Sequence, residues 1–95
     1  MEKMKAYRSV WDAIEPTAAD AAKMKARSAL MVAIERAVAS WGLTQAQAAR
    51  RLKITQPRLN DLLRGKISKF SLDALIELAS NAGLSVSVKI VRKAA

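Results

Sequence analysis

The chain contains no cysteine and no histidine among its 95 residues. Disulfide bonds and thiolate metal sites are therefore excluded, and the side chain that most often serves as a general base or metal ligand is missing. Three glycines are too few for a glycine-rich phosphate loop. The eight acidic residues are scattered, so they suggest no acid–base pair. We expect no enzyme activity, no cofactor and no metal.

Long apolar runs are also missing. No stretch approaches the roughly 20 apolar residues that cross a bilayer, and no apolar run follows the charged start of the chain. The lack of cysteine suits a reducing compartment. The sequence therefore predicts a cytoplasmic protein with no membrane partner. Aromatic residues make up only 4% of the chain, too few for the stacking platforms that bind RNA.

Positive charge is what the chain has in excess. Its 17 Lys and Arg against 8 Asp and Glu give a net charge of +9. Most of this excess falls between Thr44 and Phe70, where Asp61 is the sole acid. Such a concentrated basic patch attracts a polyanion, although a run of charge can also be a solubilising surface. The concentration on one short segment favours the nucleic-acid interpretation.

The apolar residues, 52% of the chain and dominated by alanine, predict one small, mostly helical domain. Residues 1–16 are expected to form an arm or short extended segment, because Pro16 stops any helix before it. Thr17 and Asp20 then have the spacing of a capping box, and the helix they open should end at Gly42. Its apolar stripe is spaced by four, four and three, at Leu30, Ile34, Val38 and Trp41.

Further helices are indicated by their capping residues. Thr44, with Gln47 three residues later, opens a second helix. Thr55 opens a third over about residues 56–64, and Ser71 opens a fourth. We therefore predict a compact helix-turn-helix bundle of about four to five helices, with the DNA-binding domain spanning residues 17–84.

The last part of the chain changes period. Residues 85–91 alternate polar and apolar side chains, which predicts a short C-terminal β-strand. A lone strand leaves its backbone groups without partners. It is expected to pair either with residues 7–13 or with the same strand of a second subunit, in which case it is a dimerisation element.

The segment from Thr44 to Lys66 has the pattern of two short helices joined by a tight turn. Such a pair places a helix in the major groove of DNA. Ala49 is expected where the two helices cross, because a small side chain there lets their axes approach. The apolar seam beneath the pair is predicted at Leu52, Ile54, Leu59 and Leu62.

The third helix is the candidate recognition helix. Gln pairs with adenine and Arg with guanine, so Gln56 and Arg58 are expected to contact bases, with Pro57 against a thymine methyl. The helix that Thr55 caps has amides available near a phosphate, and Gln45 is placed to bind another phosphate. The other predicted DNA-binding residues follow along the segment: Asn60, Asp61, Arg64, Lys66 and Lys69.

On these residues, Thr44–Lys66 resembles the helix-turn-helix of the lambda-repressor-like, or XRE, family, with its paired glutamines and closing Gly-Lys. The run from Gln56 to Lys66, followed by Phe70–Asp73, is similar to the HigA-like antitoxins and regulators. Ser9–Ile14 and the valine-rich tail fit the same subgroup. The resemblance covers roughly residues 9–91.

The resemblance implies a dimeric transcriptional repressor that binds an inverted repeat in its own promoter. It implies that Gln56 reads a base and that Gln45 grips the DNA backbone. One position departs from the family: Lys53 stands where a glycine is usual, because the turn requires a left-handed conformation. We expect Lys53 either to adopt this conformation at a cost of about 1 kcal/mol or to form a slightly different turn.

An alternative function stays open. A HigA-like antitoxin would mainly bind and neutralise a ribonuclease toxin of the RelE/HigB kind, and such toxins are commonly basic. The acids Asp12, Glu15 and Asp20 form the one stretch that could face such a partner. Alternatively, residues 85–91 could add a strand to the sheet of the toxin. Both functions are compatible with DNA binding.

Overall fold

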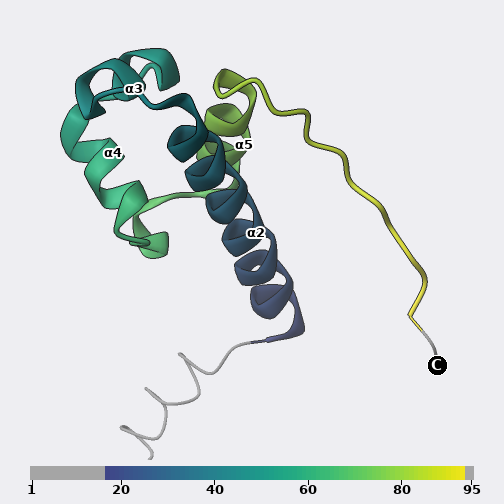
Figure 1. Ribbon diagram of the computed structural model, residues 1–95. Coiled ribbons are helices and arrows are strands. Elements are labelled where there is room, and N and C mark those ends of the chain that lie inside the picture. Colours follow the sequence, from purple (N-terminus) through teal and green to yellow (C-terminus); the bar gives the residue numbers. More distant parts are fainter. Residues whose placement is uncertain (1–16, 94–95) are drawn as a thin grey trace, which may run out of the picture.

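The computed structural model describes residues 17–93. A long helix and a shorter one lie side by side, and two short helices close one end of the bundle (Figure 1). The elements in chain order are α2 (Ala18–Trp41), α3 (Gln45–Leu52), α4 (Gln56–Leu63), the 3-10 helix η1 (Ile67–Lys69) and α5 (Leu72–Asn81). The mostly helical bundle predicted from the sequence is confirmed, and none of its helices is long and apolar enough to span a membrane. The arm predicted over residues 1–16 lies outside the described residues.

The described helices begin where their capping residues predict, at Thr17, Thr44, Thr55 and Ser71. Two of these are complete capping boxes. In the first, the Thr17 hydroxyl accepts a 3.0 Å hydrogen bond from the Asp20 amide, and the Asp20 carboxylate accepts one from the Thr17 amide. In the second, Thr44 and Gln47 exchange the equivalent bonds at 3.2 and 3.0 Å. The start of each helix is therefore fixed by residues within three positions of it.

The turn between α3 and α4 closes on Lys53. Its backbone is left-handed, with φ 62° and ψ 41°, and it is the one non-glycine residue with positive φ in the described chain. Its amide donates to the Arg50 carbonyl at 3.1 Å, and the Ile54 amide donates to the Ala49 carbonyl at 2.9 Å. These two bonds form a Schellman motif, which normally has glycine at the left-handed position. Lys53 thus adopts the left-handed conformation that the turn requires, although glycine is the residue that adopts it most easily.

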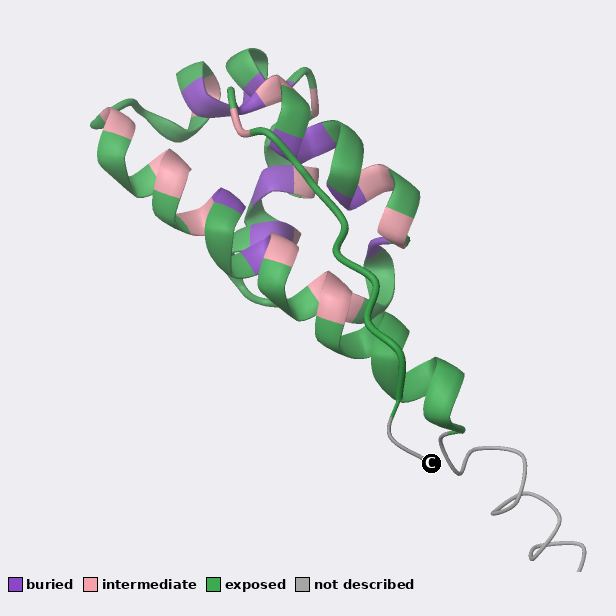
Figure 2. Ribbon diagram, turned by 90° about the vertical axis from the view of Figure 1, so that its right-hand side faces the viewer, coloured by how far each residue is buried: buried purple, intermediate pink, exposed green. Residues whose placement is uncertain are grey.

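The core lies where α3, α4 and α5 meet α2, as the buried segments in Figure 2 show. Its largest fully buried side chains are Ile34, Leu52, Leu59, Leu62, Phe70 and Leu75. Ala49 is only 2% exposed, which confirms that it is a core residue. Ile54 is half-buried, at the edge of the seam rather than inside it. Phe70 and Met31, both buried, are core residues that the sequence patterns did not identify.

The predicted C-terminal strand is absent from the described chain. After α5, Leu84 is half-buried against the core, and the residues beyond it form an extended segment that runs away from the bundle without strand pairing (Figure 1). The strand predicted over residues 85–91 is therefore not confirmed. Its physical reason is that a strand exists only with a neighbour to receive its backbone hydrogen bonds. Val88 and Ile90 remain 79% and 86% exposed.

Candidate nucleic-acid interface

The helix pair α3–α4 is held together by buried side chains from both of its members. Ala48 and Ala49 of α3 are at most 2% exposed, and Leu59 and Leu62 of α4 are fully buried. Both helices have only eight residues, too short to be stable alone. Their orientation is therefore set by packing on the core, and this packing fixes which side of α4 faces solvent.

The outer face of α4 is a row of polar side chains. Gln56, Asn60 and Arg64 recur every four residues and are all exposed. Residues at this spacing share one face of a helix. The buried Leu59 and Leu62 lie on a different side of the helix. We call Gln56, Asn60 and the C-cap residue Arg64 the polar ridge, and its side chains can enter a groove without disturbing the core.

The N-terminal ends of both short helices are exposed. Gln45 is the first residue of α3, and Gln56 is the first of α4. The Thr55 hydroxyl accepts the Arg58 amide at 3.3 Å, and Pro57 in the first turn has no amide to satisfy. A helix N-terminus carries partial positive charge and favours an anion such as a phosphate.

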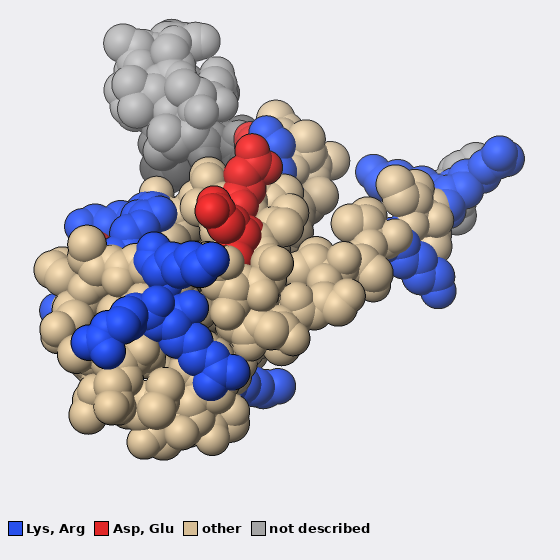
Figure 3. Space-filling model, turned by 90° about the horizontal axis from the view of Figure 1, so that it is seen from above, with Lys and Arg blue, Asp and Glu red and all other residues tan. Residues whose placement is uncertain are grey.

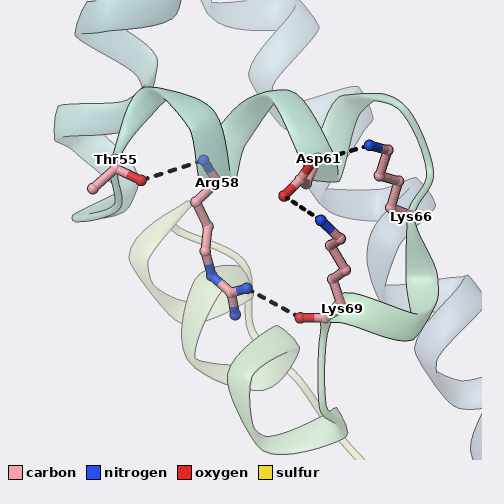
Figure 4. Close-up of polar contacts among 5 residues, drawn as sticks. All are labelled: Thr55, Arg58, Asp61, Lys66 and Lys69. Carbon is pink, nitrogen blue, oxygen red and sulfur yellow. Dashed lines mark hydrogen bonds and ion pairs between the residues drawn. The ribbon is translucent and has the colours of Figure 1, made fainter.

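Arg58 faces away from the polar ridge. It is half-buried, and one of its terminal nitrogens donates a 3.0 Å hydrogen bond to the Lys69 carbonyl (Figure 4). Its guanidinium also lies over the ring of Phe70, 4.2 Å from the centroid. The predicted base contact by Arg58 is not tested by these contacts. They show that the side chain joins α4 to η1 and to the start of α5.

Asp61 is also half-buried and lies between two lysines. Its two carboxylate oxygens are 3.5 Å from Lys66 Nζ and 3.6 Å from Lys69 Nζ (Figure 4). Both lysine side chains remain substantially exposed. The other predicted DNA-binding residues are exposed and available to a ligand: Gln45, Thr55, Gln56, Pro57, Asn60, Arg64, Lys66 and Lys69.

Further basic side chains lie at the end of α3. Arg50, Arg51 and Lys53 are exposed and were not among the predicted site residues. Arg51 stacks on the ring of Trp41 at 4.1 Å from its centroid. Figure 3, which looks down on the α3 end, shows Lys and Arg gathered over this part of the body, with a separate group on the C-terminal segment. The basic run within the motif was the signal that could have identified them.

Comparisons with known proteins agree with this geometry. The model of a helix-turn-helix domain family matches residues 14–91. A solved structure described as an XRE family transcriptional regulator is 31% identical, with a TM-score of 0.71, and the match covers 78% of this chain and 83% of the other. No curated protein matches the chain.

Proposed function

Because the chain belongs to the helix-turn-helix domain family and, within it, to the XRE transcriptional regulators, we propose that it is a dimeric repressor of its own promoter. The observation that carries the proposal is the polar ridge of Gln56, Asn60 and Arg64. These side chains are exposed on a helix whose other face is locked into the core. A helix presented in this way fits the major groove, where every base pair has a distinct pattern of donors and acceptors.

Within this proposal, Gln56 and Asn60 read bases. Each carries an amide that can pair in bidentate fashion with the N6/N7 edge of adenine, at about 1–3 kcal/mol of discrimination. Gln45 binds a phosphate beside the N-terminus of α3. Arg64, which follows α4 directly, neutralises phosphates at the other end of the recognition helix.

Two copies are needed for an inverted repeat. Their recognition helices must be about 34 Å apart to enter successive major grooves on one side of the duplex. We infer that residues 85–91 of two copies pair as antiparallel strands. The support is their alternating pattern together with the exposure of Val88 and Ile90, since an extended segment with free edges favours pairing with another chain. Sedimentation should show a dimer at micromolar concentration, and Ile90→Lys should shift it to monomer. A monomer for the unaltered chain would contradict this pairing.

Fluorescence anisotropy tests the DNA-binding function. The duplex upstream of the chain's own gene is compared with a shuffled duplex of the same composition at two salt concentrations. We expect a preference of about a thousandfold or more that survives at the higher salt. Equal binding to both duplexes, with the same steep loss in salt, would contradict a sequence-specific repressor.

A second function is favoured by the same C-terminal segment. Its exposed apolar side chains could add a strand to the sheet of a toxin, as in an antitoxin that neutralises a ribonuclease of the RelE/HigB kind. The first test is whether a small ribonuclease is encoded beside this gene, and the second is an RNA-cleavage assay with that enzyme. Stoichiometric inhibition that Ile90→Lys abolishes would support the antitoxin function. Undiminished cleavage in the presence of excess chain would exclude it for that toxin.

A further inference from the structure

We propose that Asp61 is an internal competitor of DNA: its carboxylate occupies Lys66 and Lys69 in the free protein and so lowers the affinity for every duplex, whatever its sequence. The inference rests on the proposed DNA binding and assigns Asp61 a function other than the DNA contact predicted from the sequence. It concerns overall affinity, whereas the polar ridge concerns sequence preference. The two claims can therefore fail separately.

Lys66 is brought to Asp61 by the way α4 ends. The Lys66 amide donates to the Asp61 carbonyl at 3.0 Å, and the Gly65 amide donates to the Leu62 carbonyl at 3.0 Å. Together with the left-handed Gly65, φ 72°, these bonds form a Schellman motif. The backbone of Lys66 is thus fixed beside Asp61, and its Nζ lies 3.5 Å from one carboxylate oxygen.

Lys69 is brought to the same carboxylate by Arg58. The Arg58 guanidinium, stacked on the buried Phe70, donates to the Lys69 carbonyl at 3.0 Å. This bond holds the last residue of η1 against α4. The Lys69 Nζ then lies 3.6 Å from the second oxygen of Asp61 (Figure 4). Each carboxylate oxygen therefore faces its own lysine, and both lysines are anchored through their backbones.

The position of Asp61 has an electrostatic cost of its own. It lies in the last turn of α4, where the helix dipole disfavours a negative charge. A carboxylate on a DNA-binding segment also repels phosphate. The two lysines offset both effects, while the carboxylate cancels one of their two positive charges.

The ion pairs are also weak enough to be displaced. Separations of 3.5 and 3.6 Å exceed those of a close charged hydrogen bond, and the Lys66 and Lys69 side chains are 42% and 55% exposed. Exposed pairs of this kind contribute little to stability. A phosphate can therefore replace Asp61 as the partner of each lysine. Because the two ion pairs are lost in the exchange, DNA binding is weaker by their free energy.

The decisive experiment removes the carboxylate alone. Asp61→Asn should raise the affinity for the upstream duplex and for the shuffled duplex by a similar factor, about fivefold or more, since two exposed ion pairs no longer compete. The dependence of log affinity on log salt should become steeper by about one for each subunit bound, because freed lysines release more counterions. The melting temperature should not fall, because an acid leaves the C-terminal turn of α4.

A double-mutant cycle identifies the mechanism. In a Lys66→Gln, Lys69→Gln background, Asp61→Asn should raise the affinity by a much smaller factor, because only the direct repulsion between the carboxylate and phosphate is then removed. An equal gain in both backgrounds would mean direct repulsion between Asp61 and phosphate, and it would overturn the proposal. A selective loss on the upstream duplex would also overturn it and would return Asp61 to the role of a base contact, accepting from cytosine.

Asp73→Asn is the matched control. Asp73 is exposed in the first turn of α5, and the substitution changes the net charge by the same amount. It should alter the affinity for the shuffled duplex less than about twofold. If Asp73→Asn raised the affinity as much as Asp61→Asn does, the change in net charge alone would explain both results, and the proposed competition between Asp61 and phosphate would be contradicted. Binding to the shuffled duplex is measurable without any sequence preference, so this result does not depend on the promoter hypothesis.

Discussion

The guanidinium of Arg58 lies over the ring of Phe70, with its central carbon 4.2 Å from the ring centroid. Phe70 is 1% exposed and sits directly before the cap of α5. The contact therefore ties the candidate recognition helix to the helix that packs most extensively against α2. The orientation of α4 is therefore supported by a residue that does not lie on the polar ridge.

Replacing Arg58 should consequently destabilise the fold. Arg58→Ala loses the stacking on Phe70 and the hydrogen bond to the Lys69 carbonyl, together about 1–2 kcal/mol. That corresponds to a fall in melting temperature of roughly 4–16 °C for a domain of this size. Arg58→Lys is the control, because it keeps the charge and loses the planar stacking. An unchanged melting curve together with a lost sequence preference would instead make Arg58 a base-reading residue.

Gln56 should govern sequence preference and little else. Gln56→Ala is expected to reduce the preference for the upstream duplex about tenfold or more, because each subunit loses one bidentate base contact. Binding to the shuffled duplex and the melting temperature should hardly change, since Gln56 is exposed. Ser28→Ala, an exposed site on α2, is the control and should leave anisotropy titrations on both duplexes unaltered. Equal losses on both duplexes would place Gln56 on the DNA backbone.

Ala49 should not tolerate a larger side chain. Ala49→Leu adds three carbon atoms at a site that is 2% exposed, and overpacking of this kind costs about 1–3 kcal/mol. We expect thermal unfolding, followed by circular dichroism, to show a melting temperature lower by several degrees. Ala22→Leu on the exposed side of α2 should have little effect. If both substitutions leave the melting temperature in place, the α3–α4 crossing is looser than described.

Lys53 should be improvable as a turn residue. Lys53→Gly removes a side chain from a left-handed backbone and should stabilise the fold by about 1 kcal/mol. Chemical denaturation should register this as a higher midpoint with an unchanged slope. Lys53→Ala separates conformation from charge, because it loses the ammonium group and keeps the Cβ. A gain in stability with alanine equal to that with glycine would point to charge repulsion rather than to the backbone.

What the sequence could predict was local. Thr44 and Gln47 specify a helix start between themselves, so their capping box follows from spacing alone. Leu59 and Leu62 are buried because helical periodicity sets one face of α4 against the core. The family pattern left open whether Lys53 would adopt the left-handed conformation or form a slightly different turn, and it adopts the left-handed conformation.

What the sequence could not predict depended on contacts through space. From its sequence position, Arg58 was expected to contact DNA from the first turn of its helix. In the structure, η1 and Phe70 pack beside it, so that its guanidinium contacts the Lys69 carbonyl and the Phe70 ring. The pairing of Asp61 with Lys69 has the same origin, whereas Lys66 is placed beside Asp61 by the local end of α4. The strand over residues 85–91 is not formed in the described chain for a different reason: its residues favour extended backbone, but strand structure requires a partner that a single chain does not provide.

Selection of duplexes from a random pool by the full chain tests the central claim, that the polar ridge of α4 reads DNA sequence. We predict enrichment of an inverted repeat whose half-sites lie about 10 base pairs apart, centre to centre. The same selection with Gln56→Ala should lose the preference at one position in each half-site and keep the rest. A folded chain that binds the pool but enriches no sequence would contradict the claim and leave only electrostatic binding to DNA.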